Sequence, residues 1–487
     1  MKMVKSLLLG TAAGLVAMTG AQAADLPVKA KPVQYVKICS LYGAGFYYIP
    51  GTDMCLKVGG WVRSYISYGS NGSNTLGGLT DNLNTRGTGN VDWRERGYIT
   101  ADARNQTEYG TVRSYIAIGV NGDYSRGVPA NSGMTFNANR AFIQFAGFTF
   151  GVSQSFFDLY SGPATSYYGG RINPSEDTGD AGQMVVAYTA QFGNGFSATL
   201  AAENPQANRS QGVFNAQSVS STGSISTAAL GATGAPTDSA ENIQWPDVVA
   251  NARLDQTWGS AQIMGAVHDA SGLYYGTTTA TGHPSNAVGW AVGTGIKLNA
   301  PMIGAGDYLQ AEVNYSEGAS GYVVAGGQAR WDKWGGSDYG FGAVTDAVYG
   351  AGTDVQLTTA WGVNAAYEHF WNKSWQTSVY GGYMAFSYND VATAGLCGAA
   401  VITFGAITGG CGSGDMNFQH WNVGTRTNWN VDSQTYLGVD VVYEKLQTAL
   451  AGKTATFGSG LQPVVARTFD DQDNWTVQFR VHRNFYP

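Results

Sequence analysis

The feature of the sequence that most constrains its fold is an alternation of apolar and polar side chains with a period of two residues. In the segment VDWRERGYITADAR, residues 91–104, one set of alternate positions is mostly apolar, while the other carries Arg94, Arg96 and Arg104; Glu95 is the one misfit. Because successive side chains of a β-strand point to opposite faces, this pattern predicts a strand between an apolar and a charged environment.

The same alternation recurs along the whole chain. Most of the segments that carry it are near the 9–11 residues with which a tilted strand crosses a bilayer, or somewhat longer. We predict sixteen strands, at residues 55–68, 91–104, 111–120, 139–147, 148–156, 182–192, 195–203, 247–258, 260–269, 287–298, 307–317, 356–370, 374–388, 417–430, 433–446 and 474–485.

The connections between these strands alternate in length. Seven are short turns, and the eight long ones, rich in Gly, Ser, Thr and Asn, are residues 69–90, 121–138, 157–181, 204–246, 271–286, 318–355, 389–416 and 447–473. Short turns at one end and long loops at the other are the plan of outer-membrane barrels. In lipid an open sheet would leave its edge hydrogen-bonding groups unsatisfied, so the sheet has to close.

The predicted fold class is therefore all-β, a transmembrane antiparallel up-and-down β-barrel of 16 strands. A barrel of this size is wide enough to enclose a watery channel. We place Arg94, Arg96 and Arg104 in the lumen, with Trp93 and Ile99 toward lipid. A secreted soluble β-protein is the alternative fold.

The beginning of the chain predicts export. Residues 1–23 combine two lysines, an apolar run and the small-residue site Ala21-Gln22-Ala23, which is the pattern of a secretory signal peptide. We divide the rest into a lead-in segment on the periplasmic side, residues 24–54, and the barrel domain, residues 55–487. Charged residues are 13% of the chain and aromatic residues also 13%, with no composition break that would mark a linker.

Aromatic side chains near strand ends are candidates for the girdles of a membrane barrel. From sequence alone a girdle residue is not always distinguishable from one that faces the lumen. The candidates are Trp61, Tyr65, Tyr115, Trp429, Tyr436 and Trp475.

Two long blocks resemble the general porins of alphaproteobacteria, in particular those of rhizobia and their relatives. They are VKICSLYGAGFYYIPGTDMCLKVGGWVRSY, residues 36–65, and NRAFIQFAGFTFGVSQSFFDLY, residues 139–160. The resemblance implies a homotrimeric passive diffusion channel of the bacterial outer membrane, surrounded by lipid and open to small hydrophilic solutes and ions. It also implies that the third long loop, about residues 157–181, folds into the barrel and narrows it.

The charges of this loop and of the early strands define the candidate pore constriction. An acidic loop opposite a basic wall would set a transverse field across the narrowest section. On the loop we name Asp158, Glu176, Asp177 and Asp180. On the wall we name Lys57, Arg63, Arg94, Arg96, Arg104, Arg113 and Arg140. The net charge of −7 favours cations and the wall favours anions, so the ion preference stays open.

The four cysteines, Cys39, Cys55, Cys397 and Cys411, are expected to form disulfides, since export leads to an oxidising space. Four cysteines allow three pairings, and nearness in sequence favours Cys39 with Cys55 and Cys397 with Cys411. Free thiols or metal ligands are the alternative, although no spacing typical of zinc supports a metal site.

The main functional prediction is a porin of low selectivity. The first alternative is a substrate-selective channel for sugars or organic acids, which the loop residues Tyr160, Tyr167 and Tyr168 keep open. We also consider a barrel hydrolase and a purely structural barrel; none of the five histidines lies in a nucleophile motif. We expect no enzymatic activity, cofactor, metal or nucleic-acid partner.

Overall fold

A computed structural model describes most of the chain. The described residues are 37–69, 90–124, 134–159, 166–167, 175, 178–179, 182–205, 209, 211–216, 244–276, 279–324, 330–458 and 462–487. The expected signal peptide and part of the lead-in segment lie outside these ranges. Within them, no helix has the length and apolar character needed to cross a membrane.

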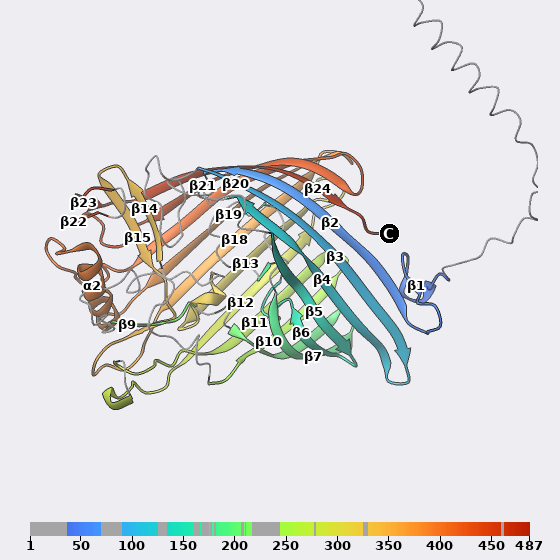
Figure 1. The fold of residues 1–487 in the computed structure, drawn as a ribbon, viewed down its shortest axis with the longest axis horizontal. Helices are drawn as coiled ribbons and strands as arrows, with labels where there is room; N and C mark the ends of the chain where they lie inside the picture. The colour runs from blue at the N-terminus through green and yellow to red at the C-terminus, as the bar shows by residue number, and fades with distance from the viewer. Residues whose placement is uncertain are drawn as a thin grey trace, which may run out of the picture.

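Sixteen antiparallel strands form a closed barrel (Figure 1). Each barrel strand pairs with the next one along the chain, and β24 closes the ring by pairing with β2. The barrel strands are β2 (Cys55–Tyr68), β3 (Val91–Thr107), β4 (Gly110–Tyr124), β5 (Thr135–Phe145), β6 (Phe148–Ser153), β7 (Gln183–Gly193), β8 (Phe196–Glu203), β10 (Asp247–Gln256), β11 (Gly259–Asp269), β12 (Val288–Asn299), β13 (Tyr308–Glu317), β18 (Thr359–Phe370), β19 (Trp375–Ser387), β20 (Phe418–Asn430), β21 (Thr435–Gln447) and β24 (Gln472–Asn484).

The predicted fold class is thus confirmed, strand by strand. All sixteen predicted segments overlap a barrel strand, and β2 has the predicted bounds. The largest differences are in β3, β4 and β5: β3 continues to Thr107 at the short turn, whereas β4 continues to Tyr124 and β5 begins at Thr135, because these residues still pair with the neighbouring strand toward the long loops. Apart from the barrel, β1 (Tyr47–Tyr48) pairs with the start of β2.

The outer face of the barrel is apolar and carries aromatic pairs near both ends. Trp375 stacks on Trp429 close to the short turns, with 6.2 Å between ring centroids. Near the long loops, Tyr443 lies 5.0 Å from Trp475. Trp429 and Trp475 are therefore girdle residues, as their places near strand ends suggested.

The other four aromatic candidates point inward. Tyr65 and Tyr115 lie on the same strand faces as Arg63 and Arg113, and Trp61 and Tyr436 contact inward-facing rings. Position near a strand end did not reveal this, but the alternation did for Trp61, Tyr65 and Tyr115, which share the faces of Arg63 and Arg113.

The long loops contain more regular structure than the sequence indicated. A four-stranded sheet combines β14 (Arg330–Gly335), β15 (Asp338–Ala343), β22 (Thr454–Phe457) and β23 (Val465–Phe469), and a three-stranded one combines β9 (Val213–Asn215), β16 (Ala347–Tyr349) and β17 (Gln356–Leu357). The helix α2 (Asp390–Phe404) lies in the segment 389–416, which we expected to be an irregular loop. Short 3-10 turns occur at η1 (Ser40–Tyr42), η5 (Thr279–Thr281) and η6 (Ser320–Tyr322). In Figure 1 these loop elements, except η1, gather at the end of the barrel opposite to β1 and the C-terminus.

Helix α2 and the four-stranded loop sheet share one hydrophobic core, whereas Val213, Ala347 and Tyr349 of the three-stranded sheet belong to a separate cluster. Leu396 and Phe404 of α2 are buried in the shared core together with Trp331 and Phe341 of the β14–β15 hairpin and Phe457 of β22. Helix α2 therefore forms because its apolar side faces this cluster. Asn389 caps its first turn by accepting a hydrogen bond from the backbone N–H of Ala392.

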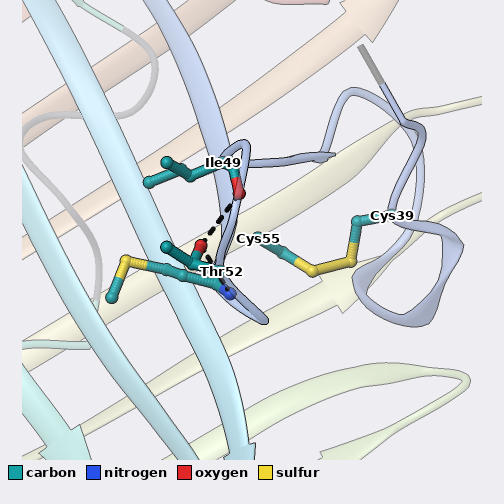
Figure 2. The surroundings of a disulfide bond; sticks show 5 residues. Cys39, Ile49, Thr52 and Cys55 are labelled. Carbon is teal, nitrogen blue, oxygen red and sulfur yellow. Dashed lines mark hydrogen bonds between the residues drawn. A yellow bond between two sulfur atoms is a disulfide. The ribbon is translucent and has the colours of Figure 1, made fainter.

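Both favoured disulfides are present. Cys397 of α2 pairs with Cys411, and Cys39 pairs with Cys55, the first residue of β2. Figure 2 shows the second of these, which ties the small lobe of η1 and β1 to the barrel; nearby, Thr52 donates a hydrogen bond to the carbonyl of Ile49.

The assignment of faces leads to a stability prediction. Ile99 lies in the middle of β3 with 57% of its surface exposed, on the face predicted to meet lipid. Ile99→Lys should lower the free energy of unfolding in a bilayer by about 2–4 kcal/mol. The control Ile99→Val should lower it by about 1 kcal/mol or less. The measurement is denaturant unfolding in lipid vesicles, and equal values for the two variants would contradict the assignment.

Candidate functional site in the barrel interior

The interior of the barrel is unevenly filled. Inward-facing side chains of β11, β13, β20 and β24 are buried along most of each strand, for example Gln262, Glu312 and His420. Partly exposed inward-facing side chains concentrate instead on β2–β5. They include Lys57, Trp61, Arg63, Asp92, Arg94, Arg96, Arg104, Arg113, Tyr115, Arg140, Phe142 and Gln144; a smaller set, Asn251, Arg253 and Asp255, lies on β10. Water therefore reaches the described interior mainly along β2–β5, and all seven of the predicted wall bases lie there.

Arg63 and Arg96 occupy directly opposed positions of β2 and β3. The guanidinium carbon of Arg63 lies 4.5 Å from the ring centroid of Trp61, and that of Arg96 lies 5.3 Å from the same ring. Arg96 also donates through Nε to Asn121 at 2.6 Å, and Arg63 to Nδ1 of His482 at 3.2 Å. These contacts hold two like charges side by side on one wall.

Arg94 and Arg140 lie further along this wall. Arg94 donates through Nη1 to the Tyr65 hydroxyl at 3.0 Å. Arg140 donates through Nη2 to the carbonyl of Gly179 in the third long loop at 2.8 Å. The basic wall and this loop are thus in direct contact.

A second basic group lies where β3 and β4 approach their short turn. Arg104 and Arg113 are directly opposed, and both donate hydrogen bonds to Asp102, with Nη2–Oδ2 distances of 2.7 and 2.9 Å. Lys57 is the register partner of Asp102 on β2. The structure therefore divides the predicted wall into two groups that are separated along the strands.

The predicted acidic residues of the third loop are only partly described. Asp158 is fully buried and forms an ion pair with Arg209, which lies in the loop after β8. Asp158 also accepts a hydrogen bond from the backbone N–H of Thr178 at 2.9 Å. Its carboxylate holds loops together and does not line a watery path. Glu176, Asp177 and Asp180 lie outside the described residues.

Tyr167 places part of the third loop against the far side of the barrel. This loop follows β6, yet the backbone N–H of Tyr167 donates to Asp440 of β21 at 2.5 Å. Its carbonyl accepts from Arg480 of β24 at 2.6 Å, and its hydroxyl donates to Asn428 of β20. Since β20, β21 and β24 are remote from β6 around the ring, the described part of the loop reaches across the interior.

Loops also pack against each other on the filled side. Phe157 lies 4.6 Å from Tyr322 of η6, and the guanidinium carbon of Arg209 lies 5.0 Å from the same tyrosine ring. Burial raises the pKa of Tyr322 well above its usual range, so it remains a hydroxyl that donates to Asp247 at 2.6 Å. Burial by itself would lower the pKa of Arg209, but the Asp158 carboxylate raises it, so Arg209 stays charged.

Several residues of this interior were not predicted from sequence. Arg480 and His482 share the inward face of the last strand, so the alternation itself contained the signal for them. Arg209 lies in a loop without periodicity, and nothing near it in the sequence pointed to Asp158.

The anchoring of Tyr167 is testable. Tyr167→Ala removes the ring beneath Arg480, 4.1 Å from its guanidinium carbon, and the bond to Asn428. Loss of these contacts should lower the free energy of local opening of the third loop by about 2 kcal/mol, which corresponds to about thirtyfold more frequent opening. Limited trypsin digestion should accordingly cleave within residues 157–181 about thirtyfold faster.

Gly438→Ala should act in the same way, because a Cβ at Gly438 would collide with the Tyr167 hydroxyl. Tyr109→Ala, in the exposed turn between β3 and β4, is the control and should leave the cleavage rate unchanged. Equal rates for all three variants would mean that Tyr167 does not hold the loop.

Solved structures support the fold. The outer membrane channel DcaP of Acinetobacter baumannii matches with a TM-score of 0.55 and 13% sequence identity, over 90% of this chain and 99% of that chain.

Comparison of the sequence with known proteins identifies the family. Porin Omp2b of Brucella melitensis is 36% identical over 214 residues, and that of Brucella suis is 37% identical; in both cases the match is 41% of this chain. It covers 54% of each relative, so the chain spans about half the length of the curated relatives it matches. The family model described as porin subfamily matches residues 25–478. The chain therefore belongs to the porin subfamily.

Proposed function

We propose that the chain forms a water-filled passive diffusion channel in the bacterial outer membrane for small hydrophilic solutes and ions. The observation that carries this proposal is the closed barrel of sixteen strands with an apolar outside and a charged, water-accessible wall inside. Unpaired strand edges are intolerable in lipid, and this architecture avoids them. A channel of this kind needs no catalytic step, and we propose none.

The constriction belongs to the same proposal. We assign the narrowing to the third loop, opposite the wall bases Lys57, Arg63, Arg94, Arg96, Arg104, Arg113 and Arg140. Glu176, Asp177 and Asp180 would supply the opposite sign of the transverse field, while Asp158 holds the loop through Arg209. Polar solutes exchange water hydrogen bonds for these groups as they pass.

A homotrimer embedded in lipid is proposed on the resemblance to general porins. The molecular mass of the detergent-solubilised protein, measured by light scattering and corrected for detergent, should be three times that of one chain. A mass of one chain would remove the trimer from the proposal and leave the channel untouched.

A substrate-selective channel remains the second candidate because aromatic rings form a continuous series inside the barrel. Tyr98 stacks on Trp61 at 4.7 Å, Trp61 lies 5.6 Å from His482, and His482 stacks on Tyr436 at 5.0 Å. Tyr436 in turn lies 6.2 Å from Tyr167 of the third loop. Saturable block of the current by one neutral sugar would favour this candidate over a channel of low selectivity.

The conductance itself is the first test. Purified protein in a planar lipid bilayer should produce discrete current steps whose size grows with salt concentration, because ions move through water. A membrane that stays electrically silent after reconstitution of folded protein would refute the proposal.

The wall residues can be tested in the same recording. Arg94→Glu combined with Arg96→Glu should shift the reversal potential in a salt gradient toward cations, since four units of charge change beside the water path. Lys373→Glu, in the exposed turn between β18 and β19, is the control and should cause no shift. An unchanged reversal potential in the double variant would remove both arginines from the pore lining.

A further inference from the structure

The basic group at the short-turn end of the wall is held in a fixed shape. Arg104 donates to Asp102 through Nε at 2.9 Å and through Nη2 at 2.7 Å, while Arg113 donates to it through Nη2 at 2.9 Å. Arg113 also donates through Nη1 to Gln144 at 3.0 Å. One carboxylate thus orients two guanidinium groups, and each arginine side chain keeps 27% of its surface exposed.

Aromatic rings flank both guanidinium groups. The Arg104 guanidinium carbon lies 5.0 Å from the ring centroid of Phe46, and that of Arg113 lies 5.1 Å from Tyr115 and 5.2 Å from Phe142. Phe46 belongs to the lobe that the Cys39–Cys55 disulfide attaches to the barrel. The site therefore offers positively charged guanidinium groups and apolar ring faces side by side.

Two further polar side chains lie close to these guanidinium groups. Lys57 brings its ammonium group to 5.9 Å from the Phe46 ring centroid. The Tyr42 ring lies 5.7 Å from the Arg104 guanidinium carbon, and its buried hydroxyl has no hydrogen-bond partner in the described part of the chain. Nη1 of Arg104 likewise makes no hydrogen bond there, so donors remain for a ligand.

The balance of charge in this group is positive. Lys57, Arg104 and Arg113 face the single carboxylate of Asp102. The inward-facing carboxylates of the filled side do not compensate along the water path, because their surfaces are at most 2% exposed. They are Glu203, Glu312, Glu368 and Glu444. A mobile anion is thus attracted to the three bases, whereas these four carboxylates lie where water does not reach them.

We propose that Lys57, Arg104 and Arg113 form a binding site for small organic anions, and that the channel consequently passes anions in preference to cations. This inference rests on the proposed channel function. A carboxylate is bound by Nη1 of Arg104 and by the Lys57 ammonium, and the Arg113 guanidinium, held by Asp102 and Gln144, adds its positive charge. The apolar body of the anion lies against the rings of Phe46, Tyr115 and Phe142.

The ion preference is measured as the reversal potential of the full-length channel in a potassium chloride gradient. The wild type should favour chloride. A variant with Lys57→Gln, Asp102→Asn, Arg104→Gln and Arg113→Gln keeps hydrogen-bonding groups but removes the excess charge. Its chloride-to-potassium permeability ratio should fall at least about fourfold, the factor expected for one charge about 5 Å from an ion in water. Lys57→Gln alone should produce a fall in the same direction.

The control is Arg483→Gln, which removes a positive charge at the same end of the barrel but on the outer face, where Arg483 contacts Asp432. It should leave the ratio unchanged.

The second measurement needs no variant. Potassium benzoate should reduce the wild-type single-channel current in the millimolar range, as weak binding predicts, whereas neutral benzyl alcohol at the same concentration should not. A current that favours potassium, or equal effects of benzoate and benzyl alcohol, would overturn the anion site while leaving the channel proposal intact. The absence of any current would overturn both.

Discussion

The pairing of β24 with β2 is the contact on which the rest of the structure depends. It joins the last strand to the first over the register from Trp61 with Asn484 to Tyr68 with Val477. Without it two strand edges would stay unpaired, which a lipid surrounding does not tolerate. Once the ring is closed, every alternate side chain has a fixed side, and the arginines of the basic wall on β2–β5 point inward.

The register of β3 with its two neighbours also brings unfavourable partners together. Arg63 opposes Arg96, and Arg104 opposes Arg113, although like charges directly opposite each other in a sheet are destabilising. The structure offsets this through Asp102, through Asn121 and through rings under the guanidinium groups. These two arginine pairs lower the stability of the sheet, yet they lie where water reaches the wall. Such unfavourable pairs are expected at positions that serve function.

The barrel was predictable and the arrangement of its loops was not, for a physical reason. A barrel strand such as β2 or β3 is recognisable from a few consecutive residues, because its side chains alternate between an apolar and a polar surrounding. Helix α2 is rich in small residues and is recognisable only by its contacts with β14, β15 and β22, which come from other loops. The pair of Asp158 and Arg209 and the anchoring of Tyr167 by Asn428 are likewise long-range contacts with no local pattern. The alternation therefore predicted which bases lie on the inward faces of β2–β5, but not which acids are buried.

The loop-filled side of the interior and the water-accessible side have separate roles, because long-range loop contacts build the first and regular strand pairing builds the second. The third loop and the loops after β8 and β13 fill the side of β7–β13, where Phe157, Tyr322 and Arg209 pack together. They leave water along β2–β5, where regular strand pairing sets the positions of the charges. A change in loop packing therefore alters the width of the path, whereas a change on the wall alters the sign of the charge along it. The strands fix the chemistry of the path because their register cannot slip by one residue without turning every arginine toward lipid.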